Sequence, residues 1–255
     1  MNTTTIENKN GNHWNWKMWA LAGIAIVAIA FIVGIWGFFG KTETTVKTNA
    51  SGQIPNAPPE NPVSKPAIVA DKVPASLIDA GEFGENIYDA AKIGDWKMAN
   101  TKLNDLKIVA EKINAEKIGS ANFEATLGKL EKVVANKDKN TSLIEANQMT
   151  LEVANLTAKY NPTVPVEVVK LDFYGRELEI WSAAQDESKL RETAQMIRQN
   201  WDAVKAKIEA KGGKKEAAAF ENLVVKIEAA KTPADYAKLA TPILDEVDNL
   251  EKVFE

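Results

Sequence analysis

The chain has 255 residues, no cysteine and a single histidine, His13. Disulfides, cysteine nucleophiles, iron–sulfur clusters and thiolate zinc sites are therefore excluded. After position 13 there is no histidine that could serve as a catalytic base or a metal ligand. With 45% hydrophobic residues, 26% charged residues and a formal net charge of −4, the chain can bury a core. The composition alone points to no specific activity.

Residues 18–40 form an uncharged apolar run. As a helix, this run would extend roughly 35 Å, enough to cross a hydrocarbon layer of ~30 Å. Aromatic residues gather at both of its ends, and Lys17 and Lys41 bracket it, which is typical of a membrane span. The sequence therefore predicts a transmembrane signal anchor over 18–40, preceded by a short polar head over 1–17.

A cleaved signal peptide is the alternative, because Ala28-Ile29-Ala30 matches a small-residue cleavage pattern. Cleavage there would leave an apolar segment at the new N-terminus, and the whole run is long for a signal peptide, so an uncleaved single-pass anchor is favoured. Lysines on the two sides give only a slight orientation bias. A short head before a long C-terminal body favours an extracytoplasmic body.

Residues 41–74 differ in composition from both neighbouring segments. They hold six of the ten prolines, with Thr, Asn and Ser between them. Such a segment buries too little apolar surface to offset the entropy of ordering it. We expect a disordered Pro/Thr/Asn linker, with an upper reach of order 100 Å if it adopts polyproline II.

The body after the linker contains an internal repeat of about ninety residues. Its strongest part is a set of apolar residues that recurs 95 positions later: Ala99, Leu106, Val109 and Ile113 match Ala194, Trp201, Val204 and Ile208. Similar matches link Phe123 to Phe220 and Leu156 to Leu250. The sequence predicts two related helical units, over 75–161 and 162–255.

Helical periodicity and capping signals divide each unit into four helices. The expected helices span 76–92, 95–115, 120–136, 140–160, 166–185, 187–210, 214–231 and 233–254. Asp95, Ser120 and Asp186 are candidate N-caps, Pro233 suits a first helical position, and Pro242 falls inside the last helix and should kink it.

One segment, 166–174, is rich in β-branched residues and could form a strand. The corresponding segment of the first unit, 73–81, has poor strand propensity, so a helix is favoured at both places. The predicted fold class is thus all-α: a transmembrane helix, a linker and a duplicated, up-down bundle-like four-helix body.

No catalytic residue, metal site or cofactor is predicted. A carboxylate-bridged di-iron bundle requires histidine, and the P-loop, nucleophile-elbow, EF-hand and dinucleotide-binding patterns are absent. Asp138, in NKDKN, lacks the spacing of a calcium loop. The body holds more acidic than basic residues, which gives no footprint for nucleic acid.

The densest polar cluster lies within LDFYGRELEIW and includes Asp172, Arg176 and Glu179. It could form a small ligand-binding site in which Arg176 holds an anion between walls made by Tyr174 and Trp181. The competing interpretation is a core stripe with Asp172 and Arg176 as a surface pair four residues apart. Helical spacing favours this second interpretation, because it places the following residues on one face: Leu171, Tyr174, Leu178 and Trp181.

The predicted function is a non-enzymatic binding or scaffolding module, held to the lipid bilayer by residues 18–40 and acting on a protein partner. The alternative is a sensory domain that binds a small molecule or cation between its helices, and a carboxylate-based hydrolase is a third hypothesis. A large cavity lined by Asp172, Arg176 and Trp181 would favour ligand binding.

Overall fold

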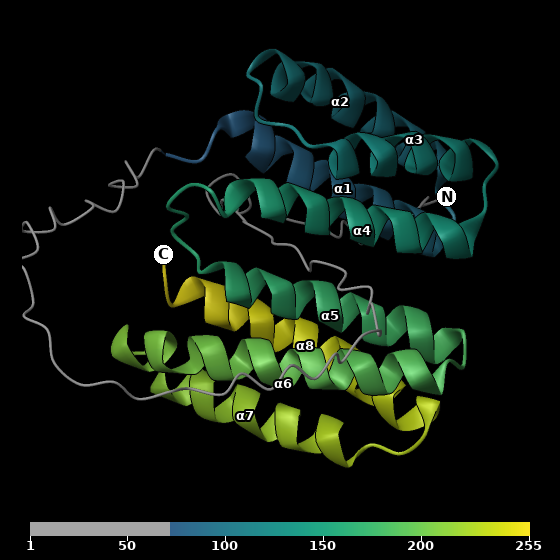
Figure 1. Ribbon diagram of the computed structural model, residues 1–255. Helices are drawn as coiled ribbons and strands as arrows, with labels where there is room; N and C mark the ends of the chain where they lie inside the picture. The colour runs from purple at the N-terminus through teal and green to yellow at the C-terminus, as the bar shows by residue number, and fades with distance from the viewer. Residues whose placement is uncertain (1–71) are drawn as a thin grey trace, which may run out of the picture. The chain divides into compact units, whose positions relative to one another are not determined.

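The computed structural model describes residues 72–255, which are drawn in colour in Figure 1. The predicted head, the anchor over 18–40 and residues 41–71 of the linker lie outside the described residues. Within the described range, no helix has both the length and the apolar character needed to span a membrane.

Residues 72–255 are all-helical, with eight helices and no strand. The helices are α1 (Ala75–Ile93), α2 (Trp96–Ala115), α3 (Ala121–Ala135), α4 (Lys139–Thr157), α5 (Val166–Ala183), α6 (Glu187–Ala210), α7 (Lys214–Ala229) and α8 (Pro233–Lys252). Each lies at or near its predicted boundaries. The segment 166–174 belongs to α5, which confirms the helix prediction over the strand alternative.

Side-chain caps start most of these helices. Asp95, Ser120 and Asp186 each accept a hydrogen bond from the backbone N–H three residues later, as predicted. Asp138 does the same for α4, so the acidic residue of NKDKN is a helix cap. Thr232 forms a reciprocal capping box with Asp235, and Pro233 occupies the first turn of α8.

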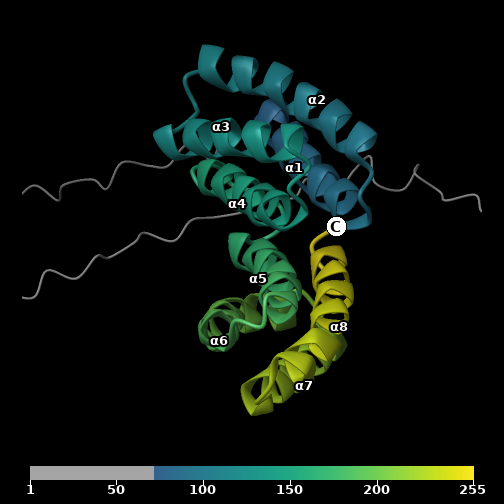
Figure 2. The same cartoon turned by 90° about the vertical axis from the view of Figure 1, so that its right-hand side faces the viewer.

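The helices pack in the same order in the two halves of the body (Figures 1 and 2). In the first, α1 lies against α2 and α4, and α4 lies against α3; in the second, α5 lies against α6 and α8, and α8 lies against α7. Contacts between α4 and α5 join the halves. The helix α8 continues through Pro242, so this proline does not end it.

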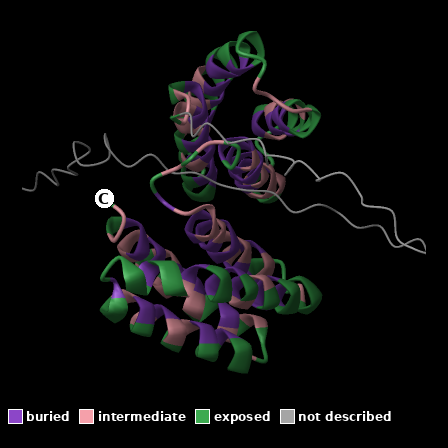
Figure 3. Cartoon of the chain, turned by 60° about the vertical axis from the view of Figure 1, so that its left-hand side comes forward, coloured by how far each residue is buried: buried purple, intermediate pink, exposed green. Residues whose placement is uncertain are grey.

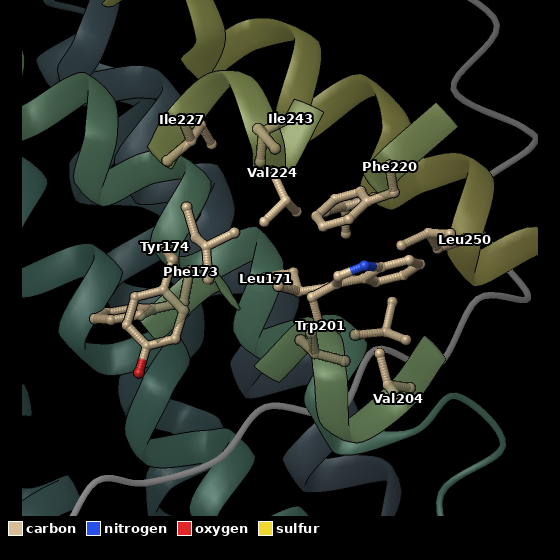
Figure 4. Close-up of a cluster of buried hydrophobic side chains, with 14 of the residues drawn as sticks. Leu171, Phe173, Tyr174, Trp201, Val204, Phe220, Val224, Ile227, Ile243 and Leu250 are labelled. Carbon is tan, nitrogen blue, oxygen red and sulfur yellow. The ribbon is translucent and has the colours of Figure 1, made fainter. Parts of the chain in front are cut away.

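Two hydrophobic clusters fill the interior, one mainly within α1–α4 and the other mainly within α5–α8. Figure 3 shows buried residues on the inward sides of the helices and exposed residues on the outward sides. Positions matched by the repeat are buried in both halves, including these pairs: Leu106 and Trp201, Val109 and Val204, Ile113 and Ile208, Phe123 and Phe220, Leu156 and Leu250. In the second cluster, Trp201 stacks at a tilt on Phe220, with ring centroids 4.8 Å apart (Figure 4).

Two glycines let helices approach each other closely. A Cβ at Gly84 would lie 2.9 Å from Thr150 Cγ2 of α4. A Cβ at Gly175 would lie 2.6 Å from Leu244 Cδ2 of α8. The first helix of each half therefore packs against the last helix of its half at a point where only glycine fits without displacing a neighbour.

We predict that Ile227→Ala destabilises the protein by about 2–5 kcal/mol, because Ile227 is fully buried and truncation leaves a cavity. Val225 lies on the same helix but is 52% exposed, so Val225→Ala should change the free energy of unfolding by no more than about 0.5 kcal/mol. Urea unfolding followed by circular dichroism would measure both variants. Equal effects would contradict this assignment of the core face of α7.

Candidate functional site

The helix α5 is covered on every side. Residues 171–175 are all buried, and five consecutive residues span more than one helical turn. One face enters the second hydrophobic cluster through Leu171, Tyr174 and Leu178, as the core-stripe interpretation predicted. Another face carries Asp172, Arg176 and Glu179, whose spacing of four and three residues places them in one row.

Arg176 forms the centre of this polar row. Its Nη1 lies 2.6 Å from Asp172 Oδ2, and its Nη2 lies 3.5 Å from Glu85 Oε1 on α1. The guanidinium carbon also lies 5.6 Å from the ring centroid of Tyr88. The side chains of Asp172 and Arg176 are both only 12% exposed. The pair predicted four residues apart thus exists, but the prediction that it lies on the surface is wrong, because α1 covers it.

Glu179 belongs to a second set of contacts between α5 and α1. Its Oε2 accepts a hydrogen bond of 2.9 Å from the Tyr88 hydroxyl. Lys92 Nζ lies 2.8 Å from Glu179 Oε1 and 2.7 Å from Oε2. Lys92 is about half exposed, so this ion pair marks the solvent edge of the polar region while Arg176 marks its interior.

Further carboxyl groups lie beside Arg176 and make the region acidic. Glu251, in the last turn of α8, is 6% exposed, and its carboxyl group makes no hydrogen bond or ion pair with another described side chain. Burial, followed by the nearby charges of Asp172 and Glu85, raises the pKa of Glu251 to about 9. We call the set of Glu85, Asp172, Arg176 and Glu251 the carboxylate cluster.

Glu85 and Asp172 also hold protons more tightly than exposed carboxyls do. Burial raises the pKa of Glu85 to about 7 even though Arg176 opposes this shift. Burial likewise raises the pKa of Asp172, again against the effect of Arg176. One guanidinium therefore does not compensate fully for the removal of three carboxyl groups from water.

The structure brings together only part of the predicted ligand site. Asp172, Arg176 and Glu179 share one face of α5, whereas Tyr174 points into the second hydrophobic cluster beside Phe173, with ring centroids 5.1 Å apart (Figure 4). Trp181 is half-buried and packs against both hydrophobic clusters. The aromatic neighbour of Arg176 is instead Tyr88 of α1.

Sequence reasoning missed the residues that α1 and α8 contribute. Glu85, Tyr88 and Lys92 follow one another at spacings of three and four residues, which places them on one face of α1. This row was a visible signal of a polar helix face. Nothing in it shows that α1 meets α5, and Glu251 stands next to Leu250 and Lys252 without any comparable pattern.

Across residues 72–255, no group of three or more His, Cys, Asp or Glu side chains is arranged to hold a metal ion. Asp172 and Glu85 instead pair with the guanidinium of Arg176. The chemistry available to this site is proton binding and charge pairing.

A cavity of about 340 Å³ lies elsewhere, at the turn between α6 and α7 and the end of α8. Its lining includes Lys211, Glu216, Asn249 and Lys252. None of the five residues of the predicted ligand site lines it. This cavity therefore gives no support to ligand binding at the predicted site.

Comparisons with protein-family models, with curated proteins and with solved structures find no match to this chain.

We predict that Arg176→Met destabilises the protein by about 3–5 kcal/mol, because it leaves Asp172 and Glu85 buried without a compensating charge. Arg191 is the matched control: it pairs with Glu187 four residues away, and both side chains are more than 60% exposed. Arg191→Met should change the free energy of unfolding by less than about 1 kcal/mol. Similar losses in the two variants would show that burial of the Arg176 pair has no energetic consequence.

Proposed function

We propose that the protein is a membrane-anchored, extracytoplasmic module without enzymatic activity, which binds or scaffolds a protein partner through a duplicated four-helix body over 75–161 and 162–255. The observation that carries the anchoring is the uncharged run at 18–40, long enough to cross a bilayer and bracketed by Lys17 and Lys41. The proline-rich segment over 41–74 would hold the body away from the membrane surface.

The site geometry supports a binding role over a catalytic one. Arg176 is already engaged by Asp172 and Glu85, so it is not free to hold a substrate anion. Tyr88 and Lys92 are engaged by Glu179 in the same way. A catalytic acid or base must reach its substrate, and these groups are instead directed at one another inside the helical packing.

The small-molecule or cation-binding alternative has less support. It requires a cavity lined by Asp172, Arg176 and Trp181, whereas the cavity described above is bordered by the turn after α6 and by residues of α7 and α8. The carboxylate-based hydrolase requires two carboxyl groups facing a shared substrate space. The carboxyls of Asp172 and Glu85 face a guanidinium instead.

Membrane fractionation of the full chain tests the anchor. We expect the chain to stay in the membrane pellet after alkaline carbonate washing and to keep its original N-terminus, since an uncharged helix of this length inserts stably. A variant lacking residues 18–40 should be released into the soluble fraction. Release of the intact chain by the wash, or a mature chain that starts after Ala30, would contradict an uncleaved anchor.

The same preparation tests the orientation, because the chain has no cysteine and one introduced thiol is unique. Val225 is 52% exposed on α7 and suits this purpose. With Val225→Cys, a membrane-impermeant maleimide should label intact cells. Labelling that requires permeabilisation would place the body in the cytoplasm and overturn the proposed orientation.

A further inference from the structure

The contacts around Arg176 link the two halves of the body through charged and polar groups. Arg176 on α5 pairs with Glu85 on α1, and Glu179 on α5 binds Tyr88 and Lys92 of α1. Apolar packing also joins the halves: Leu151 and Ala154 of α4 belong to the second cluster, and Ile180 of α5 belongs to the first. Docking of the first half on the second therefore depends in part on the charge state of this region.

Glu251 supplies this region with a buried carboxyl group that can bind a proton. It is a buried carboxyl with no hydrogen-bond or ion-pair partner among the described residues, at the end of α8. The charged groups that act on it are Asp172 and Arg176 from α5, Glu85 from α1 and Asp248 from α8. This set holds several acidic groups and one guanidinium, so a negative charge on Glu251 has no cation of its own to stabilise it.

We propose that the carboxylate cluster is a proton-operated latch: when it carries protons, α1–α4 dock firmly on α5–α8, and when it loses them, repulsion across the cluster loosens that docking. The ligand of the site is the proton itself. The inference rests on contacts within residues 72–255 and holds whether or not the chain is anchored in a membrane.

The charged groups on the neighbouring helices define where the repulsion acts. On α1, Asp89 also faces Arg176, and on α5, Glu179 is paired with Lys92. The helix α4 packs against both α1 and α5, but its acidic residues have other partners: Glu145 lies 3.8 Å from Lys129, and Glu152 accepts a hydrogen bond from Gln148. The repulsion is therefore concentrated where α1, α5 and α8 meet.

The direction of the pH effect follows from linkage. In the unfolded chain a glutamate has a pKa near 4.5, whereas in the folded protein the pKa is about 7 for Glu85 and about 9 for Glu251. Between these limits the folded state binds more protons, so stability falls as pH rises. The docking should be strongest below about pH 4.5, weaken as pH rises, and be weakest above about pH 9.

Distance measurement between two spin labels tests the latch in the full chain, kept in mild detergent. Because there is no native cysteine, labels can be placed at Ile108→Cys on α2 and Val225→Cys on α7, both at exposed positions. We expect a narrow distance distribution at about pH 6 and loss of that narrow peak at about pH 10. Return to about pH 6 should restore the peak.

Two controls make the result specific. A label pair within the second half, at Gln195→Cys and Val225→Cys, should keep its distance at both pH values, because only docking between halves is loosened. Adding Glu85→Gln and Glu251→Gln to the Ile108–Val225 pair should preserve the narrow peak at about pH 10, because the amides cannot ionise. If the double glutamine variant does not fold, Glu251→Gln alone should still raise the pH at which the peak is lost.

Three outcomes would overturn the latch. The first is an Ile108–Val225 distribution that does not change between the two pH values. The second is loss of the peak in the Gln195–Val225 pair at the same pH, which would indicate general unfolding. The third is a glutamine variant that loses its peak at the same pH as the parent chain.

Discussion

The rest of the packing depends on the enclosure of α5. Its neighbours cover it on all sides, and its charged residues must therefore find partners inside the protein. Arg176 meets this requirement by pairing with Asp172 on its own helix and with Glu85 on α1, and in doing so it ties the two halves together. Glu251 of α8 is buried in the same region, and its carboxyl group has no partner among the described side chains. It therefore forms a proton-binding position near Arg176.

Much of the fold could be predicted because its elements are defined locally. Caps such as Asp95 and Asp186 act over three residues, and an apolar stripe on a helix such as α6 needs only the sequence of that helix. The helix α5 was harder to predict, because its β-branched start resembles a strand. Comparison with the first half decided that case correctly.

The site could be predicted only in part, because its residues come from distant segments of the chain. The spacing of Asp172 and Arg176 gives the ion pair, but it says nothing about whether another helix covers the pair. Burial is decided by α1, whose Glu85 lies about ninety positions earlier in the chain. For the same reason a pocket walled by Tyr174 and Trp181 stayed open as an alternative, although helical spacing favoured the core stripe; both residues pack against hydrophobic clusters.

The central claim is that Arg176 stabilises the body by compensating buried carboxyl groups that join the two halves. A thermodynamic cycle tests it most directly: the free energy of unfolding is measured for Arg176→Met in the parent chain and again in a chain carrying Glu85→Gln and Asp172→Asn. If charge compensation is the cause, the cost of losing Arg176 should fall from about 3–5 kcal/mol to about 1 kcal/mol once the carboxyls are neutral. An unchanged cost would show instead that Arg176 acts through its packing on Tyr88.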